Sequence, residues 1–149
     1  MVSFLIAYAT WSGNTQEVAE LIGETLTDRG FEVEMYRIGV GRVPNPREFD
    51  AMIIGSFTWD RGSTPDEVKD FVADLGYKPP NVYVFGTGDT QFGGERLFCG
   101  AAIKLAKFYE SNYSTLKIEQ SPRGTQEKLV VKWTEGVIKN WLHLNALKY

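Results

Sequence analysis

"FLIAYATWSGNTQEVAELI", residues 4–22, runs from an apolar segment through a polar turn into a helical pattern. The nearly continuous apolar run at 3–9 is typical of a strand that is covered on both faces, as in a parallel sheet. After Asn14 the apolar residues recur at helical spacing, and Gly30 stands where a glycine commonly ends a helix. The stretch therefore predicts a buried strand followed by a helix, the repeating unit of an α/β fold.

Apolar runs and helical patterns alternate along the rest of the chain. Segments 51–57 and 81–88 are nearly continuously apolar, so we expect them to be central strands. Segment 31–38, "FEVEMYRI", alternates more, and 114–121 is the last strand candidate. Both are expected at the edges of the sheet, with 31–38 exposing one face to solvent. The side chains of 31–38 predicted to point inward are Phe31, Val33, Met35 and Ile38.

Helices are predicted between these strands. One begins near Pro65 in "PDEVKDFVADL", where the proline and the early acids suit a helix start. Further helices fit 97–111 and 126–144, whereas 39–50, with two glycines and two prolines, holds no more than one turn. Right-handed crossovers between such elements predict a doubly wound, three-layer α/β sandwich with five parallel strands. Residues 1–149 suffice for a single domain of this kind.

Composition excludes several classes of function. The formal net charge is only −3, so there is no electrostatic footprint for nucleic acid. One cysteine and one histidine are too few for an internal disulfide or a cysteine and histidine zinc site. Met1 leads directly into an apolar strand, without a basic leader or the roughly 18 apolar residues of a membrane span. We expect a soluble cytoplasmic protein with no membrane partner.

Ligands of doubly wound sheets bind outside the carboxyl ends of the strands, which here are followed by the loops 10–15, 56–63 and 87–98. The first loop, "TWSGNT", offers three hydroxyls, a glycine and an asparagine at a helix N-terminus. Backbone N–H groups, hydroxyl donors and the helix dipole together can hold a phosphate without a cation. An ordinary helix cap by Ser12 or Asn14 is the alternative interpretation.

The sequence lacks two common nucleotide-binding motifs. The glycine-lysine-serine or threonine ending of a P-loop is absent. Gly86 and Gly88 begin the spacing of a dinucleotide fingerprint, but Gln91 stands where the third glycine would be needed. A phosphate bound at this edge of the sheet is therefore expected to be held by the first loop.

The second and third loops offer flat apolar surfaces. Trp59, among turn residues directly beyond a buried strand, can give a planar ligand a large stacking face. In the third loop Gly86 and Gly88 allow close backbone approach, Asp89 is a polar orienting group, and Phe92 is a second aromatic. Two aromatics and a phosphate loop at one edge indicate a flat ring that bears a phosphate.

These motifs resemble those of the flavodoxins, the small FMN electron carriers. The matching stretches are "TWSGNT" at 10–15, "GSFTW" at 55–59, and "GTGD" at 86–89 followed by "FCGA" at 98–101. The resemblance covers nearly the whole chain and implies the strand order 2-1-3-4-5 with FMN held without covalent attachment. It also implies one-electron transfer at low potential, in transient encounters of a monomer with a flavodoxin reductase and acceptor proteins, and no bound substrate.

The resemblance further implies a role for individual residues. The phosphate would lie on Thr10, Ser12, Asn14 and Thr15. Trp59 would stack on the inner face of the isoalloxazine and Phe92 on the outer face, while Asp89 and its neighbours would hold the pyrimidine edge. The full set of expected cofactor-binding residues is Thr10, Trp11, Ser12, Gly13, Asn14, Thr15, Ser56, Phe57, Thr58, Trp59, Asp60, Gly62, Thr87, Gly88, Asp89 and Phe92.

The chain departs from the family pattern beside the ring. Asp60 replaces the usual glycine after the tryptophan, and a residue with a Cβ resists positive φ at a cost of roughly 1 kcal/mol. This hinders the peptide flip that turns a carbonyl toward the ring nitrogen of one-electron-reduced flavin. Arg61 and Arg96 are predicted near the ring, and Ser63 stands where the family commonly has an acid. Cations favour the anionic, fully reduced flavin. Our hypothesis is therefore that the potential of the second reduction step is less negative than in acidic flavodoxins.

Other classes of function share this architecture. The stretch "TQFGGERLFCGA" resembles flavodoxin-like activators of manganese ribonucleotide reductase, whereas "SFTW" and a helix start at Pro65 favour a flavodoxin. A flavin-free signalling or binding domain stays open, because fold alone does not fix function. An FMN-dependent reductase or quinone reductase would need a substrate pocket, for which the chain shows no added element. An electron-transfer protein is thus favoured over an enzyme with its own substrate.

Several conspicuous residues are interpreted as structural. Cys99, in an apolar helix start, is expected to be a small core residue without a redox role. His143 is expected to lie at the surface or in packing, and Trp133 and Trp141 fit one buried helix face. Trp11 lies inside the phosphate loop, where it would cover the phosphate or ribose or form part of a partner surface.

Overall fold

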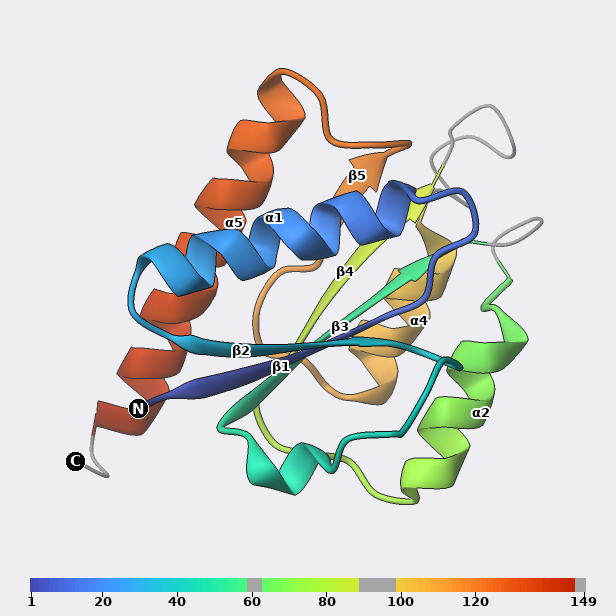
Figure 1. The fold of residues 1–149 in the computed structure, drawn as a ribbon, viewed down its shortest axis with the longest axis horizontal. Helices are drawn as coiled ribbons and strands as arrows, with labels where there is room; N and C mark the ends of the chain where they lie inside the picture. The colour runs from blue at the N-terminus through green and yellow to red at the C-terminus, as the bar shows by residue number, and fades with distance from the viewer. Residues whose placement is uncertain (59–62, 89–98, 147–149) are drawn as a thin grey trace.

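The computed structural model describes residues 1–58, 63–88 and 99–146. Its sheet has the strand order β2-β1-β3-β4-β5, and all neighbouring strands are parallel. The predicted fold class, a doubly wound five-stranded parallel sheet in the order 2-1-3-4-5, is therefore confirmed (Figure 1). The strands are β1 (Ser3–Tyr8), β2 (Glu32–Arg37), β3 (Ala51–Phe57), β4 (Val82–Gly88) and β5 (Leu116–Glu119).

The helices form the two outer layers. They are α1 (Asn14–Asp28), α2 (Asp66–Leu75), α4 (Gly100–Phe108) and α5 (Thr125–Asn145), and a short 3-10 turn, η1, spans Pro46–Glu48. Figure 1 shows α1 and α5 on one face of the sheet and α2 and α4 on the other. No helix among the described segments is both long and apolar enough to cross a bilayer.

Two elements are shorter than their sequence patterns predict. The last strand covers 116–119 rather than 114–121, and Gln120 turns the chain with a φ of 57°. Helix α4 ends at Phe108 rather than 111, and Glu110 has a φ of 51°. Because side-chain periodicity does not reveal a left-handed residue, both ends were placed too late by the pattern.

Each face of the sheet has its own hydrophobic core. Phe4, Ile6 and Tyr8 pack under α1 and α5, whereas Leu5 and Ala7 pack under α2 and α4. The alternation explains why β1 reads as a continuous apolar run. On α5 the predicted buried face is confirmed, with Trp133 7% and Trp141 3% exposed.

The edge strand β2 differs from its prediction. Tyr36 and Ile38 are buried on the α2 side, where the Tyr36 ring centroid lies 5.8 Å from that of Phe71. Phe31 and Val33 pack on the opposite side, against the α1 core. The prediction of one solvent-exposed face, with Phe31, Val33, Met35 and Ile38 all pointing inward, was therefore wrong, and Met35 is 38% exposed. Strand side chains alternate, so residue 38 shares a face with residue 36, and α2 covers that face.

Candidate functional site

The carboxyl ends of β1, β3 and β4 meet at one edge of the sheet. Tyr8 is in register with Gly55, and Phe57 with Thr87. The backbone pairing continues beyond the strands, because the Ala9 N–H donates to the Gly55 carbonyl at 3.0 Å. The three loops singled out from the sequence therefore begin side by side, as the topology requires.

The turn between β1 and α1 is shaped by its glycine. Gly13 has a φ of 96° and occupies the helix N-cap without a side-chain cap hydrogen bond. Its N–H instead donates to Thr10 Oγ1 at 3.0 Å. The alternative interpretation, in which the side chain of Ser12 or Asn14 caps the helix, was therefore wrong. The side chain of Thr10 folds the loop, and the helix end keeps its own donors.

The first turn of α1 presents backbone donors to this edge. The first helical hydrogen bond runs from the Glu17 N–H to the Gly13 carbonyl at 3.0 Å. The N–H groups of Asn14, Thr15 and Gln16 precede it, so they have no acceptor within the helix. Together with the positive end of the helix dipole, they form a site that suits an anion.

Thr15 ties this helix end to the neighbouring loop. Its hydroxyl lies 2.8 Å from the hydroxyl of Thr87, and the two residues are 0% and 2% exposed. A hydroxyl pair can use only one of its two protons internally, so the other remains available to a further acceptor. The pair thereby joins the loop after β1 to the end of β4.

Thr58 makes a second connection, between the loop after β3 and α4. Its backbone N–H donates to the Thr87 carbonyl at 3.2 Å, and its Oγ1 accepts from the Ala101 N–H at 3.3 Å. Ser56, which is fully buried, donates its hydroxyl to the Phe57 carbonyl at 2.7 Å. The Thr58 backbone thus connects the end of β3 to the end of β4, and the Thr58 hydroxyl connects it to the start of α4.

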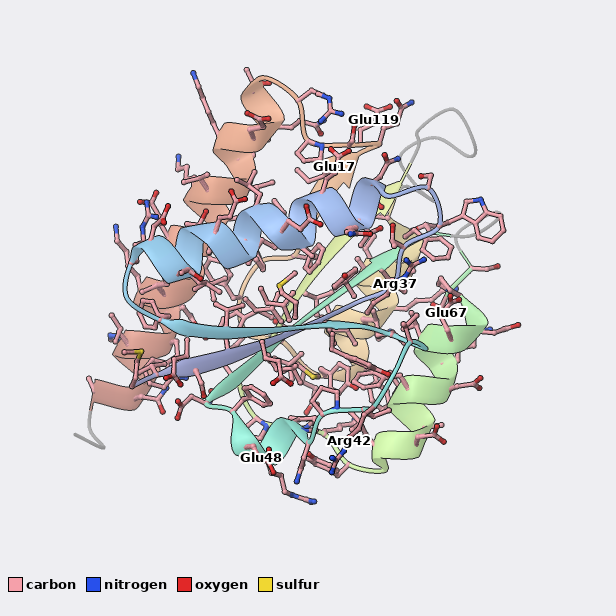
Figure 2. All side chains as sticks on the ribbon, viewed as in Figure 1. Glu17, Arg37, Arg42, Glu48, Glu67 and Glu119 are labelled. Atoms are coloured by element: carbon pink, nitrogen blue, oxygen red, sulfur yellow. The ribbon has the colours of Figure 1, made fainter. Side chains whose placement is uncertain are left out.

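Charges around the anion site are balanced by a surface ion pair. Glu17 in the first turn of α1 would repel a bound anion, but its carboxylate lies 2.8 Å from the Arg123 guanidinium. Figure 2 shows Glu17 and Glu119 at this end of the molecule. Burial raises the pKa of the Tyr8 phenol, and the charge of Arg37 at the end of β2 acts in the opposite direction. The loop 10–15 itself carries no charged side chain.

The described site residues fall into three classes of exposure. Thr10, Thr15, Ser56 and Thr87 are buried, Gly13, Asn14, Phe57, Thr58 and Gly88 are half-buried, and Trp11 and Ser12 are exposed. The remaining predicted residues lie outside the described residues: Trp59, Asp60, Gly62, Asp89 and Phe92, with the flanking Arg61 and Arg96. Within the described ranges, no group of three or more histidine, cysteine or acidic residues could hold a metal ion.

Cys99 and His143 have the positions that their sequence contexts predict. Cys99 is fully buried at the start of α4, and its burial raises the thiol pKa from 9.0 to about 12. A thiol that stays protonated is a poor nucleophile and a poor metal ligand. His143 is exposed near the end of α5.

The raised pKa of Cys99 predicts a pH dependence of stability. Below pH 9 the thiol is protonated in both states, whereas above it the unfolded chain loses this proton and the folded chain keeps it. The free energy of unfolding of wild type should therefore fall as the pH rises from 9 toward 12. Urea unfolding between pH 8 and 10 should show a steeper fall in wild type than in Cys99→Ala, because burial also raises the pKa of Tyr83 and Tyr109 and both proteins keep these phenols. Equal slopes in both proteins would contradict the prediction.

Comparison with known families gives one clear assignment. The family model described as flavodoxin matches residues 6–133. A curated relative from Bacillus subtilis, "Probable flavodoxin 2", is 33% identical and covers 89% of this chain and 92% of its own length. The flavodoxin of Maridesulfovibrio salexigens is 28% identical, with 92% of this chain and 97% of that protein covered.

Solved structures agree in fold. Oxidised flavodoxin 2 from Bacillus cereus superposes with a TM-score of 0.78 at 30% identity, covering 93% of this chain and 99% of that one. A short-chain flavodoxin associated with a bacterial microcompartment gives a TM-score of 0.83 at 24% identity, covering 95% and 99%. The second of these, at its lower identity, supports the fold alone.

Proposed function

The chain belongs to the flavodoxin family and is an FMN electron carrier, and we propose that it shuttles single electrons at low potential between a reductase and acceptor proteins. In this proposal residues 1–149 act as one monomeric domain in the cytoplasm. The observation that carries the proposal is the uncapped N-terminus of α1, surrounded by neutral hydroxyl side chains at the carboxyl edge of the sheet. The free, buried Cys99 suits a reducing compartment.

The donor set fits the phosphate of FMN. Three N–H groups of α1 precede the first helical bond, and a phosphate offers strong acceptor oxygens to them. Thr10 Oγ1 already accepts from the Gly13 N–H, so its own proton is available to a phosphate oxygen. We assign Ser12 and the Asn14 side chain to the same phosphate, because they flank this helix end. No lysine or arginine is needed within 10–15.

The flavin ring, when bound, supplies reversible electron transfer, and the chain supplies its surroundings. Trp59 and Phe92 are assigned to its two faces, and Asp89 with its neighbours to the pyrimidine edge. These assignments rest on the sequence motifs, because the residues lie outside the described ranges. Their support from the structure is indirect: the described ends of β3 and β4, Phe57 and Gly88, lead into these loops at the same sheet edge.

Partner proteins are assigned to the same edge. Electron transfer in a transient encounter needs only a small contact area, so residues 57–63 and 89–97 would suffice. A net charge of −3 gives weaker long-range steering than a strongly acidic carrier would have. Neither a ribonucleotide reductase activator nor a flavin-free domain is favoured by the family match or by the curated relatives.

An anaerobic redox titration tests the proposal. The FMN-loaded protein should be reduced in two resolved one-electron steps, followed in the visible spectrum. Arg61→Glu should make the second potential more negative by roughly 60 mV, a tenfold change in a one-electron equilibrium constant. Asp60→Gly should separate the two steps further, because glycine permits the positive φ that aspartate resists.

Two outcomes would count against this function. If the protein bound no FMN, the carrier proposal would be wrong. Reduction in a single two-electron step, unchanged in Asp60→Gly, would indicate a hydride-type enzyme instead. Lys139→Glu serves as the matched charge control, because it makes the same charge change at an exposed position of α5, two residues before Trp141, which packs on Phe4 near the start of β1 and so at the opposite edge of the sheet. Its potentials should equal those of wild type.

A further inference from the structure

A groove of about 650 Å³ lies between α2 and α4, on the face of the sheet opposite α1 and α5. Its apolar walls are formed by Val68 and Val72 of α2 and by Leu105 and Phe108 of α4. Phe108 is 42% exposed, so part of its side chain is open to the groove. None of the residues assigned to the FMN site lines this groove.

Three lysines line the same groove. Lys69 comes from α2, Lys78 follows α2, and Lys104 comes from α4, and none of the described residues that line the groove is acidic. The Lys78 ammonium lies 4.5 Å from the centroid of the Phe108 ring, over one apolar wall. Within the described part of the chain, Lys69 and Lys78 enter no ion pair. A protein with a net charge of −3 thus gathers positive charge around one apolar hollow.

Favourable interactions with the helix dipoles do not explain the positions of all three lysines. Lys78 lies just beyond the C-terminal end of α2, where a cation is favourable in any helix. Lys69 lies in the first half of α2 and Lys104 in the middle of α4, where the dipole gives no such benefit. A ligand that is itself anionic would benefit from Lys69 and Lys78.

We propose that this groove binds an aliphatic carboxylate, an amphiphile of the fatty acid type. The alkyl chain lies against Val72, Leu105 and Phe108, and the carboxylate pairs with the ammonium groups of Lys69 and Lys78. Lysine suits this arrangement because its stem packs on apolar surface while its charged head stays accessible. The site is separate from the FMN site and does not depend on it.

Size favours a small molecule over a protein partner. The groove volume falls inside the range of about 300–1,000 Å³ that is usual for small-molecule sites. Eleven of the described residues line it, whereas one side of a standard protein interface uses about 20–30. Residues 68–76 span about 12 Å along α2, room for an extended chain of medium length.

Calorimetric titration of the FMN-loaded protein with sodium decanoate, below its micelle concentration, tests the proposal. One decanoate is expected to bind per chain. Octanoate should bind about tenfold more weakly, because two methylenes fewer are buried. Decyltrimethylammonium, which has the same chain and the opposite charge, should not bind.

Two double variants distinguish the effect of the groove lysines from the effect of a change in net charge. Lys69→Gln/Lys78→Gln is expected to weaken decanoate binding about tenfold, the effect of losing charge-assisted contacts. Lys107→Gln/Lys132→Gln removes the same charge from exposed positions outside the groove and should stay within twofold of wild type. Both double variants should keep the FMN spectrum and the urea midpoint of wild type.

Several results would overturn the proposal. These are no binding of decanoate, equal binding of decyltrimethylammonium, or many weak sites per chain of the kind a detergent occupies. Equal affinity of the two double variants for decanoate would show that the groove lysines do not bind the carboxylate. If the groove variant lowered only the affinity for a redox partner protein, the groove would be a protein docking surface rather than a ligand site.

Discussion

Thr15→Val is expected to lower the affinity for FMN about 100-fold while leaving the affinity for riboflavin within threefold of wild type. The variant removes the hydroxyl assigned to the phosphate and leaves the buried Thr87 hydroxyl without its partner at 2.8 Å. A hydrogen bond to a charged group contributes about 1.5–3 kcal/mol, and an unsatisfied buried hydroxyl adds its own cost. Riboflavin lacks the phosphate, so it reports only on the ring part of the site.

Thr87→Val distinguishes positioning from direct contact. If Thr87 donates to Thr15 and Thr15 donates to the phosphate, the Thr87 variant should lose about tenfold in FMN affinity and again spare riboflavin. Titration of apoprotein with each flavin, followed by quenching of flavin fluorescence, measures both affinities. The selective loss for FMN is a signature that general destabilisation would not produce.

Thr25→Val is the matched control for this pair. Thr25 is also buried on α1, and its hydroxyl donates to the Leu21 carbonyl at 2.8 Å, within the helix and away from the sheet edge. It should lose stability without changing the ratio of FMN to riboflavin affinity. If Thr15→Val weakened both flavins equally, or neither, the assignment of Thr15 to the phosphate would be wrong.

Much of the fold follows from patterns that are local in the sequence. The apolar runs of β1, β3 and β4 identify the central strands because a strand covered on both faces has no polar side. The helix that begins at Asn14 and the left-handed glycine at Gly30 also follow from short-range signals. The predictions failed for two reasons. The ends of β5 and α4 are set by left-handed residues, which side-chain periodicity does not reveal, and the burial of Tyr36 and Ile38 is decided by where α2 packs.

The candidate site divides in the same way. Topology predicts which loops meet, so residues 10–15, 56–58 and 87–88 could be assigned to one edge before any coordinates. The pairing of Thr15 with Thr87 could not, because the two residues are 72 positions apart and each also suits a role of its own. The bond from Ala101 to Thr58 was missed for a related reason: a backbone N–H has no signature in the sequence. The ion pair of Glu17 with Arg123 likewise depends on how α1 and α5 pack.

Gly55→Ala is expected to destabilise the protein by about 3 kcal/mol. Gly55 in β3 is in register with Phe85 of β4, and a Cβ on Gly55 would overlap the Phe85 ring. Phe85 is fully buried in the core under α1 and α5, so its ring has little room to move. Overpacking of this kind typically costs 1–3 kcal/mol or more. Urea unfolding of the apoprotein measures the loss without a contribution from bound flavin.

A double-mutant cycle isolates the contact between Gly55 and Phe85. Phe85→Leu alone should cost stability by leaving a cavity, but the alanine substitution made in that background should cost less than 1 kcal/mol, because the smaller side chain yields space. Gly23→Ala is the control glycine: it lies inside α1, and its Cβ would come close to the flexible Met35 side chain, with Sδ at 3.2 Å, and would meet Ile6 and Val33 at an ordinary contact distance of 3.7 Å. Alanine is a better helix former than glycine, so this variant should be neutral or more stable. If Gly55→Ala and Gly23→Ala had the same effect, or if the cost at position 55 were unchanged beside leucine, the packing of the Phe85 ring on Gly55 would not be what requires a glycine there.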